Sequence, residues 1–168
     1  SFGVSHPADV SSPAAACEVV WADGSFATRF PVRYQGVEVE VHLQLAGEHK
    51  TMHALAAIAA SVAAGAELAD AEQGLATLEP VAGRLCPVVG PDGARVIDDS
   101  YNANPDSVLA ALGVLAAAPG RRTLVLGDLA ELGGGVLELH RQIGQRASEH
   151  GIERLMTIGE YSRQAGLA

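Results

Sequence analysis

The sequence is most informative about its fold at Val96-Ile97-Asp98-Asp99-Ser100-Tyr101-Asn102-Ala103-Asn104-Pro105-Asp106-Ser107. A short apolar run ends in two carboxylates, and a hydroxyl, a phenol and two amides follow. Asn104 is a favourable N-cap and Pro105 suits the first helical position. The polar cluster is therefore expected at the carboxyl end of a strand, directly before a helix, where open α/β sheets bind ligands. Spacing alone leaves a second interpretation equally open, in which these polar groups only cap the helix.

Beyond Cys86 the sequence alternates between strand and helix patterns. Strands are expected at 95–98, 123–126 and 154–158, and helices at 105–118 and 136–150. This alternation predicts an α/β fold with a parallel βαβαβ core and right-handed crossovers. The strand ends Asp98-Asp99, Gly127-Asp128 and Gly159-Glu160 are then expected along one edge of the sheet.

The first half of the chain has a different character. Residues 1–16 are rich in Ser, Pro and Ala and are expected to form a loop, and residues 17–45 are expected to form strands. The period-two alternation of 37–45 is typical of an antiparallel strand with one wet face. Helices are expected from Glu48 to a stop at Gly65 and over about 69–77, followed by a linker at 79–84.

Composition limits the possible functions. The chain has 168 residues, of which 48% are hydrophobic, and its 11 basic and 20 acidic residues give a net charge of −9. That balance argues against non-specific nucleic-acid binding, which depends on basic surface. Cys17 and Cys86 have neither metal-binding nor redox spacing, which favours free thiols in a reducing cytosol. Neither a signal peptide nor a membrane span is evident, so a cytoplasmic location is expected.

Several strings occur in an order that resembles a known family. Gly47-Glu48-His49 is followed by Gly83-Arg84, by DDSYNANPDS at 98–107, by GDLAELG at 127–133 and then by His140. This order resembles the Mur ligases of peptidoglycan synthesis. Within that family, the two longer strings resemble the branch that joins D-Ala-D-Ala to UDP-N-acetylmuramoyl-tripeptide.

The resemblance implies a domain organisation. Mur ligases have three domains, and residues 1–83 would be the C-terminal part of the central ATP-binding domain, built of β-strands and helices. Residues 84–168 would be most of the Rossmann-like C-terminal domain. No GxxGK[ST] phosphate-binding loop occurs in the 168 residues, so we expect this chain alone to be inactive as a ligase.

The implied reaction is an ATP-dependent ligation through an acyl-phosphate intermediate, with ATP and Mg²⁺ as cofactors. The implied partners are UDP-N-acetylmuramoyl-tripeptide and D-Ala-D-Ala, without nucleic acid or membrane. The metal ligands are expected outside this chain. The resemblance implies a monomeric full-length enzyme, whereas exposed strand edges within 17–66 favour self-association of the fragment.

The resemblance also assigns roles to individual residues. Arg84 resembles a linker arginine that grips ATP phosphate, and Asp99 resembles an acid that contacts the nucleotide, so both are candidate catalytic and nucleotide-binding residues. His49 and His53 are further candidates for the nucleotide site. The candidate substrate-binding residues, which would shape the dipeptide pocket or meet the incoming ammonium, are Tyr101, Asn102, Asn104, Asp128 and Glu131.

Structural interpretations stay open beside these roles. Arg84 could be a solvated linker residue, Asp99 a carboxylate that caps nearby amides, and His49 a polar helix start. Asn104 could serve only as the N-cap, and Glu131 could be an exposed loop charge.

Two positions depart from the family pattern, and one further histidine is expected to have no role in the site. Lys50 and His53 stand where the family usually has Asn, which leaves contact between His53 and adenine open. His140 lies in mid-helix beside apolar residues and is expected to be a structural histidine.

Two rival functions belong to other classes of protein. The first is a non-catalytic nucleotide- or peptide-binding module on the same fold, because one fold serves many functions. The second, a dinucleotide-dependent dehydrogenase, is disfavoured because no GxGxxG follows a strand.

Overall fold

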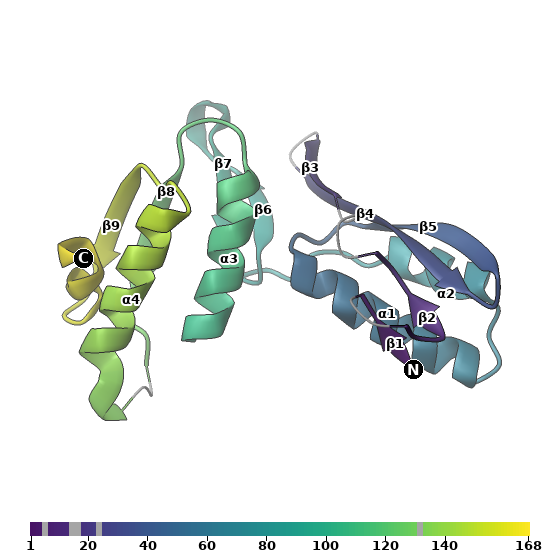
Figure 1. The fold of residues 1–168 in the computed structure, drawn as a ribbon. Helices are drawn as coiled ribbons and strands as arrows, with labels where there is room; N and C mark the ends of the chain where they lie inside the picture. Colours follow the sequence, from purple (N-terminus) through teal and green to yellow (C-terminus); the bar gives the residue numbers. More distant parts are fainter. Residues whose placement is uncertain (5–6, 14–17, 23–24, 131–132) are drawn as a thin grey trace. The chain divides into compact units, whose positions relative to one another are not determined.

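The computed structural model describes residues 1–4, 7–13, 18–22, 25–130 and 133–168. The chain forms two compact units, Ser1–Asp98 and Asp99–Ala168 (Figure 1). Among the described residues, no helix combines the length and the apolar character needed to cross a membrane.

The first unit contains a five-stranded sheet built around its longest strand. Its strands are β1 (Phe2–Gly3), β2 (Val10–Ser11), β3 (Glu18–Ala22), β4 (Ser25–Tyr34) and β5 (Val37–Leu43). Strand β4 pairs antiparallel with β2 and β3 along one edge and with β5 along the other. The β4–β5 hairpin turns at Gln35 and Gly36, which both have positive φ, as a tight two-residue hairpin turn requires.

The prediction that residues 1–16 form only a loop is wrong in part. Strands β1 and β2 pair in parallel, and β2 adds to the edge of β4. Val10 of β2 is only 1% exposed and belongs to the core. Two-residue strands are too short to show a period of two, so only their tertiary partners define them.

Two helices complete the core of the first unit. Helix α1 (Glu48–Ala63) and helix α2 (Leu68–Ala76) follow the strands, and α1 ends before Gly65, whose φ of +99° suits a chain reversal. The predicted alternation of β5 is confirmed, since Val41 and Leu43 are buried. The buried apolar side chains come from β2, β4, β5 and both helices: Val10, Phe30, Val32, Val41, Leu43, Ala54, Leu55, Ile58, Leu68 and Leu75.

The first unit also contains a hairpin that the sequence did not predict. Strand β7 (Arg95–Asp98) lies where a strand was expected, but it pairs antiparallel with β6 (Cys86–Val89). The prediction that this strand pairs in parallel is therefore wrong among the described residues, where its partner is antiparallel. The 3-10 turn η2 (Pro91–Gly93) joins the two strands, and a short Pro-Asp-Gly connection permits only antiparallel pairing.

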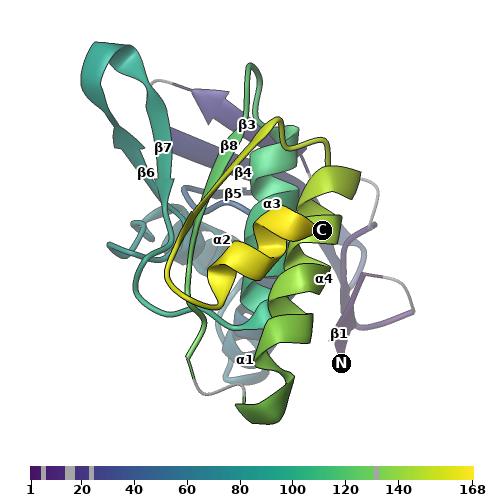
Figure 2. The same cartoon turned by 90° about the vertical axis from the view of Figure 1, so that its left-hand side faces the viewer.

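The second unit follows the predicted alternation closely. Its elements are α3 (Pro105–Ala117), β8 (Thr123–Gly127), the 3-10 turn η3 (Gly133–Gly135), α4 (Val136–Glu149), β9 (Arg154–Ile158) and the 3-10 turn η4 (Ser162–Leu167). Strands β8 and β9 pair in parallel, so the expected β–helix–β arrangement is confirmed here. Helices α3 and α4 lie side by side, and η4 packs against α4 (Figure 2).

The two faces of the β8–β9 pair differ sharply. Leu124, Leu126 and Leu155 face the helices and join the core of this unit. On the other face, Val125, Met156 and Ile158 are 57%, 52% and 68% exposed. Helices therefore cover one face of this strand pair, although parallel strands are usually covered on both.

Candidate functional site

The segment between β7 and α3 ends in a well-made helix cap. The Asn104 side chain accepts a hydrogen bond from Ser107 N at 2.9 Å, while Asn104 N donates to Ser107 Oγ at 3.0 Å. Two backbone donors at the helix start are thereby satisfied, and Pro105 occupies the first turn. The predicted N-cap role of Asn104 is confirmed. Its Nδ2 and the second acceptor position of Oδ1 then remain for contact with a substrate.

The polar residues before this cap lie at the surface. Tyr101 is 68% exposed, Asn102 is exposed and Asp99 is half-buried. These residues open the second unit, directly before the capped start of α3. Such an arrangement of amide, phenol and carboxylate groups suits the recognition of a small polar ligand.

Asp128 follows β8 and binds the backbone of the next strand connection. Its Oδ1 accepts from Tyr161 N at 2.9 Å and from Ser162 N at 2.7 Å, and its Oδ2 accepts from Glu160 N at 2.9 Å. These donors, the Ser162 N–H first among them, hold the pKa of the Asp128 carboxyl below its ordinary value. Asp128 therefore has a structural role, while a carboxylate has about four acceptor positions, so Oδ2 could still accept from an ammonium.

Close packing accompanies the Asp128 contacts. Gly159 has a φ of +135°, and a Cβ at this position would overlap the Asp128 carboxylate. The sequence predicts that Gly127-Asp128 and Gly159-Glu160 share one edge, and these hydrogen bonds confirm that expectation for β8 and β9. Gly159, directly after β9, is the sequence feature that indicates a close approach of another group at this point.

His140 lies within α4 and is fully buried. Its Nε2 accepts from Leu129 N at 3.1 Å, and its Nδ1 donates to Val136 O at 2.7 Å. The expectation of a structural histidine is confirmed by this burial, but its contact with the residue after Asp128 was not predicted. Glu131 lies outside the described residues.

In the first unit, the two candidate histidines stand one turn apart at the start of α1. Their rings meet edge to face with centroids 5.9 Å apart. His49 is half-buried and His53 is exposed. The helix begins after Gly47, a buried residue with φ of +112°, so the backbone conformation that presents these rings depends on glycine.

Arg84 is exposed on the turn that follows α2. Its N–H donates to Val81 O at 3.0 Å, and Gly83 and Leu85 on either side have positive φ. The backbone is therefore sharply bent here, and the guanidinium stands on a surface turn. Arg84, His49 and His53 belong to the first unit, whereas the substrate-binding candidates belong to the second.

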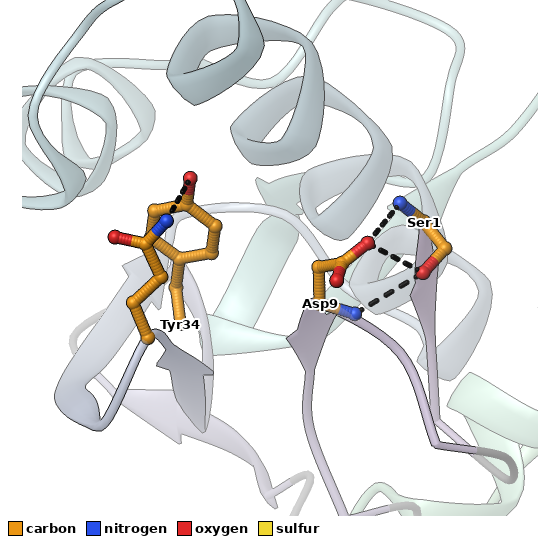
Figure 3. Close-up of polar contacts among 4 residues, drawn as sticks. Ser1, Asp9 and Tyr34 are labelled. Atoms are coloured by element: carbon orange, nitrogen blue, oxygen red, sulfur yellow. Dashed lines mark hydrogen bonds and ion pairs between the residues drawn. The ribbon is translucent and has the colours of Figure 1, made fainter.

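Within the described ranges, no group of three or more His, Cys, Asp or Glu side chains is placed to hold a metal. Cys86 is a free thiol, and Cys17 lies outside the described residues. The first unit has an open hollow of about 340 Å³ lined by residues of β2 and of the β4–β5 turn. Asp9 lines this hollow, and Figure 3 shows its bonds to Ser1. Gln35, also in the lining, donates to the Tyr34 hydroxyl. None of the candidate site residues that the structure describes lines it.

Comparison with protein families matches residues 83–167, half of the chain, to the family model described as "Mur ligase, glutamate ligase domain". The chain belongs to the Mur ligase family. The family match begins at Gly83, whereas the compact units divide after Asp98. The domain bounds 1–83 and 84–168 stay a prediction.

Curated Mur ligases resemble the chain over most of its length. The UDP-N-acetylmuramoyl-tripeptide–D-alanyl-D-alanine ligase of Escherichia coli K12 is 42% identical over 144 residues, which cover 86% of this chain and 32% of that enzyme. The enzyme of the same name from Haemophilus influenzae is 38% identical over 125 residues, which cover 74% of this chain and 27% of that enzyme. The chain thus spans about a third of the length of the curated relatives that it matches.

Solved Mur ligase structures share the fold. A crystal structure of MurF from Acinetobacter baumannii matches 98% of this chain and 34% of its own length, with a TM-score of 0.83 and 30% identity. MurF from Thermotoga maritima in complex with ADP matches 95% of this chain and 38% of its own length, with a TM-score of 0.69 and 21% identity. The predicted α/β Mur ligase fold is therefore confirmed.

Proposed function

We propose that this chain is part of an ATP-dependent ligase that joins D-Ala-D-Ala to UDP-N-acetylmuramoyl-tripeptide in the bacterial cytoplasm, as a step of peptidoglycan precursor synthesis. The observation that carries the proposal is the 42% identity with a curated enzyme of that name. The polar segment 99–104, in which Tyr101 and Asn102 are exposed and Asn104 caps the following helix, supports it. This chain spans about a third of the length of its relatives, so the complete reaction would also need the parts of the enzyme that the chain does not span.

The proposed chemistry needs an activated carboxylate and an amine held in line with it. ATP would phosphorylate the carboxylate of the tripeptide, and the amine of D-Ala-D-Ala would attack the acyl phosphate and release phosphate. The protein's contribution is charge stabilisation and positioning of the two reactants. Exposed polar side chains such as Tyr101 and Asn102, on backbone held by the Asn104 cap, are suited to positioning a reactant.

On the nucleotide side, Arg84 would grip phosphate oxygens through its planar guanidinium, and Asp99 would contact the nucleotide. His49 and His53 would contact the base from the start of α1, where their rings lie together. Mg²⁺ belongs to the proposed reaction, but no acidic cluster among the described residues fits it. The roles proposed for these residues therefore include no bond to the metal.

On the dipeptide side, Tyr101 and Asn102 offer a phenol and an amide at the surface. Asn104 would add its Nδ2 and the second acceptor position of Oδ1, and Asp128 only the remaining acceptor position on Oδ2. Glu131 would be a second carboxylate for the ammonium. Recognition of the dipeptide is therefore proposed to depend mainly on the exposed side chains of Tyr101 and Asn102.

A segment exchange tests the proposal. The matching third of the Escherichia coli ligase is replaced by residues 1–168 of this chain, and phosphate release is measured with each substrate left out in turn. We expect release that requires both UDP-N-acetylmuramoyl-tripeptide and D-Ala-D-Ala. The 168-residue chain alone is expected to be inactive, because it has no phosphate-binding loop.

Two variants of the exchanged enzyme sharpen the result. Asn102→Ala is expected to raise the KM for D-Ala-D-Ala, whereas Gln73→Ala, an exposed change on α2, is expected to leave it unchanged. Folded exchanged enzyme without dipeptide-dependent phosphate release would contradict the proposal and favour a non-catalytic binding module.

A further inference from the structure

We propose that His140 is a positioning residue that holds the backbone at the carboxyl end of β8, and that dipeptide binding depends on this hold. The kinetic part of the proposal rests on the function proposed above. Strand β8 ends at Gly127, and Asp128 and Leu129 follow it at the edge where α/β sheets bind ligands. His140 reaches this segment from the second turn of α4.

Two hydrogen bonds define the state of the ring. Val136 O can only accept, so Nδ1 of His140 carries the proton that it donates at 2.7 Å. Leu129 N–H can only donate, so Nε2 is the unprotonated acceptor at 3.1 Å. His140 is therefore held as one neutral tautomer, with a local bond to its own helix and a second bond to the segment after β8.

Burial makes the bond to Leu129 difficult to replace. His140 is 0% exposed and Leu129 is 2% exposed, so water has little access to substitute for the bond between them. A buried N–H without an acceptor costs more than an average hydrogen bond contributes. Loss of Nε2 would thus displace the backbone at Leu129, and with it the adjoining Asp128.

Asp128 connects this segment to the other strand. Its carboxylate accepts the N–H groups of Glu160, Tyr161 and Ser162, and the Tyr161 ring lies 6.4 Å from the His140 ring. A single buried imidazole therefore supports the β8 end directly and the β9 end through Asp128.

The chain provides a matched control in the same helix. His150 also has its Nδ1 bonded to the carbonyl four residues earlier, at 2.8 Å from Arg146 O. It lies at the end of α4 and half-exposed. His150→Gln therefore removes an imidazole with the same local bond, without touching the β8 end.

The first test uses the 168-residue chain and the nitrogen spectrum of its imidazoles. We expect His140 in the Nδ1–H tautomer, with Nε2 unprotonated. An Nε2–H tautomer, or a ring that exchanges between both, would overturn the proposal whether or not any variant folds.

The second test separates the two bonds. His140→Gln places an acceptor near the position of Nε2, whereas His140→Asn reaches only the position of Nδ1. The Leu129 amide is expected to exchange with solvent about tenfold faster or more in His140→Asn, because its N–H loses a buried acceptor. His140→Gln is expected to stay closer to the wild type, and His150→Gln to match it. Equal acceleration in the Gln and Asn variants of His140 would overturn the proposal.

The third test uses the exchanged ligase. His140→Asn is expected to raise the KM for D-Ala-D-Ala about tenfold while kcat falls much less, and His140→Gln to restore most of the loss. A purely structural role would lower the amount of active enzyme and leave KM unchanged, which would overturn the proposal. If the exchanged ligase without these substitutions is inactive, the proposed function fails, and the spectrum and amide exchange decide the positioning role by themselves.

Discussion

The two units of this chain are stabilised in different ways. In the first, apolar side chains of a five-stranded sheet meet two helices, and Val32, Val41, Leu55 and Ile58 are 0% exposed. In the second, a two-stranded sheet is covered on one face, and polar side chains bind backbone groups at its ends. The first unit depends mainly on packing and the second depends also on directed hydrogen bonds.

This difference predicts which substitutions should destabilise each unit most. Removal of a large apolar group is costly in a close-packed core, because the cavity left behind closes only partly. Removal of a polar side chain that binds buried backbone is costly for another reason, since the backbone group keeps its need for a partner.

The self-association expected for residues 17–66 stays a prediction.

The largest effect is expected in the core of the first unit. Phe30→Ala should lower the free energy of unfolding of this unit by about 3–5 kcal/mol, because Phe30 is 1% exposed between sheet and helices. Denaturant unfolding followed by hydrogen exchange of β4 measures it. Val125→Ala on the open face of β8 is the control, with an expected change within about 0.5 kcal/mol. A large cost at Val125 would mean that this face is covered in solution.

The next effect concerns two helical glycines of the second unit. Gly144 in α4 is buried, and a Cβ there would collide with the backbone of Ala165 in η4. Gly144→Ala should destabilise the unit by about 1–3 kcal/mol through overpacking. Gly113→Ala in α3, where a Cβ meets nothing within 4 Å, should stabilise it by about 0.4–1 kcal/mol. Thermal unfolding of both variants decides whether η4 packs closely against α4.

A smaller effect separates structure from recognition at the start of α3. Asn104→Ala should cost about 1 kcal/mol of stability, because Ser107 N loses its acceptor. Asn102→Ala, two residues earlier, should leave the denaturation midpoint unchanged and should alter only binding of the dipeptide in the exchanged ligase. Equal stability losses in both variants would contradict this division.

The smallest effect is a dependence on pH. Arg122 donates from its side chain and its backbone N–H to Glu153, which lowers the pKa of Glu153 from 4.5 to about 2. A carboxyl with a lowered pKa adds stability that is complete above its ordinary pKa and is lost as pH falls from 4.5 towards 2. Glu153→Gln should therefore lower the urea midpoint at pH 6 and differ little from the wild type near pH 2.

A matched variant checks the assignment to this pair. Glu149→Gln removes another exposed glutamate, which pairs with Arg146 in α4. Its urea midpoint should follow the wild type at both pH values, because an exposed ion pair on a helix contributes little. A parallel loss in both variants would point to general charge effects rather than to the Arg122 contacts.

Much of the fold could be predicted from periodicity and turn residues. The alternation in β5, the helix from Glu48 and the Asn104-Pro105 helix start all follow local rules that the structure obeys. The β6–β7 hairpin was missed, although Pro91-Asp92-Gly93 is a recognisable turn sequence. Strands β1 and β2 could not be found, because two residues carry no period and their partners lie on β4.

The candidate site was predictable in its position and less so in its contacts. Asp128 and Gly159 were placed along one edge by the strand pattern, and the structure brings them together. The capture of three N–H groups by Asp128 depends on the path of the backbone after β9, which no spacing encodes. The bond between His140 and Leu129 likewise spans eleven residues and leaves no local signal.

The Asp128 carboxylate places a negative charge at this edge. Three consecutive amides that point at one anion are the kind of cradle that elsewhere receives phosphate or a peptide carboxylate. Here the Asp128 carboxylate already fills it, so an acid from solution would have to displace an anion that is covalently part of the chain. If a zwitterionic peptide reached this point, the Asp128 carboxylate would repel the carboxylate end of the peptide and attract its ammonium end. Asp128 would thereby favour one orientation of the peptide over the other.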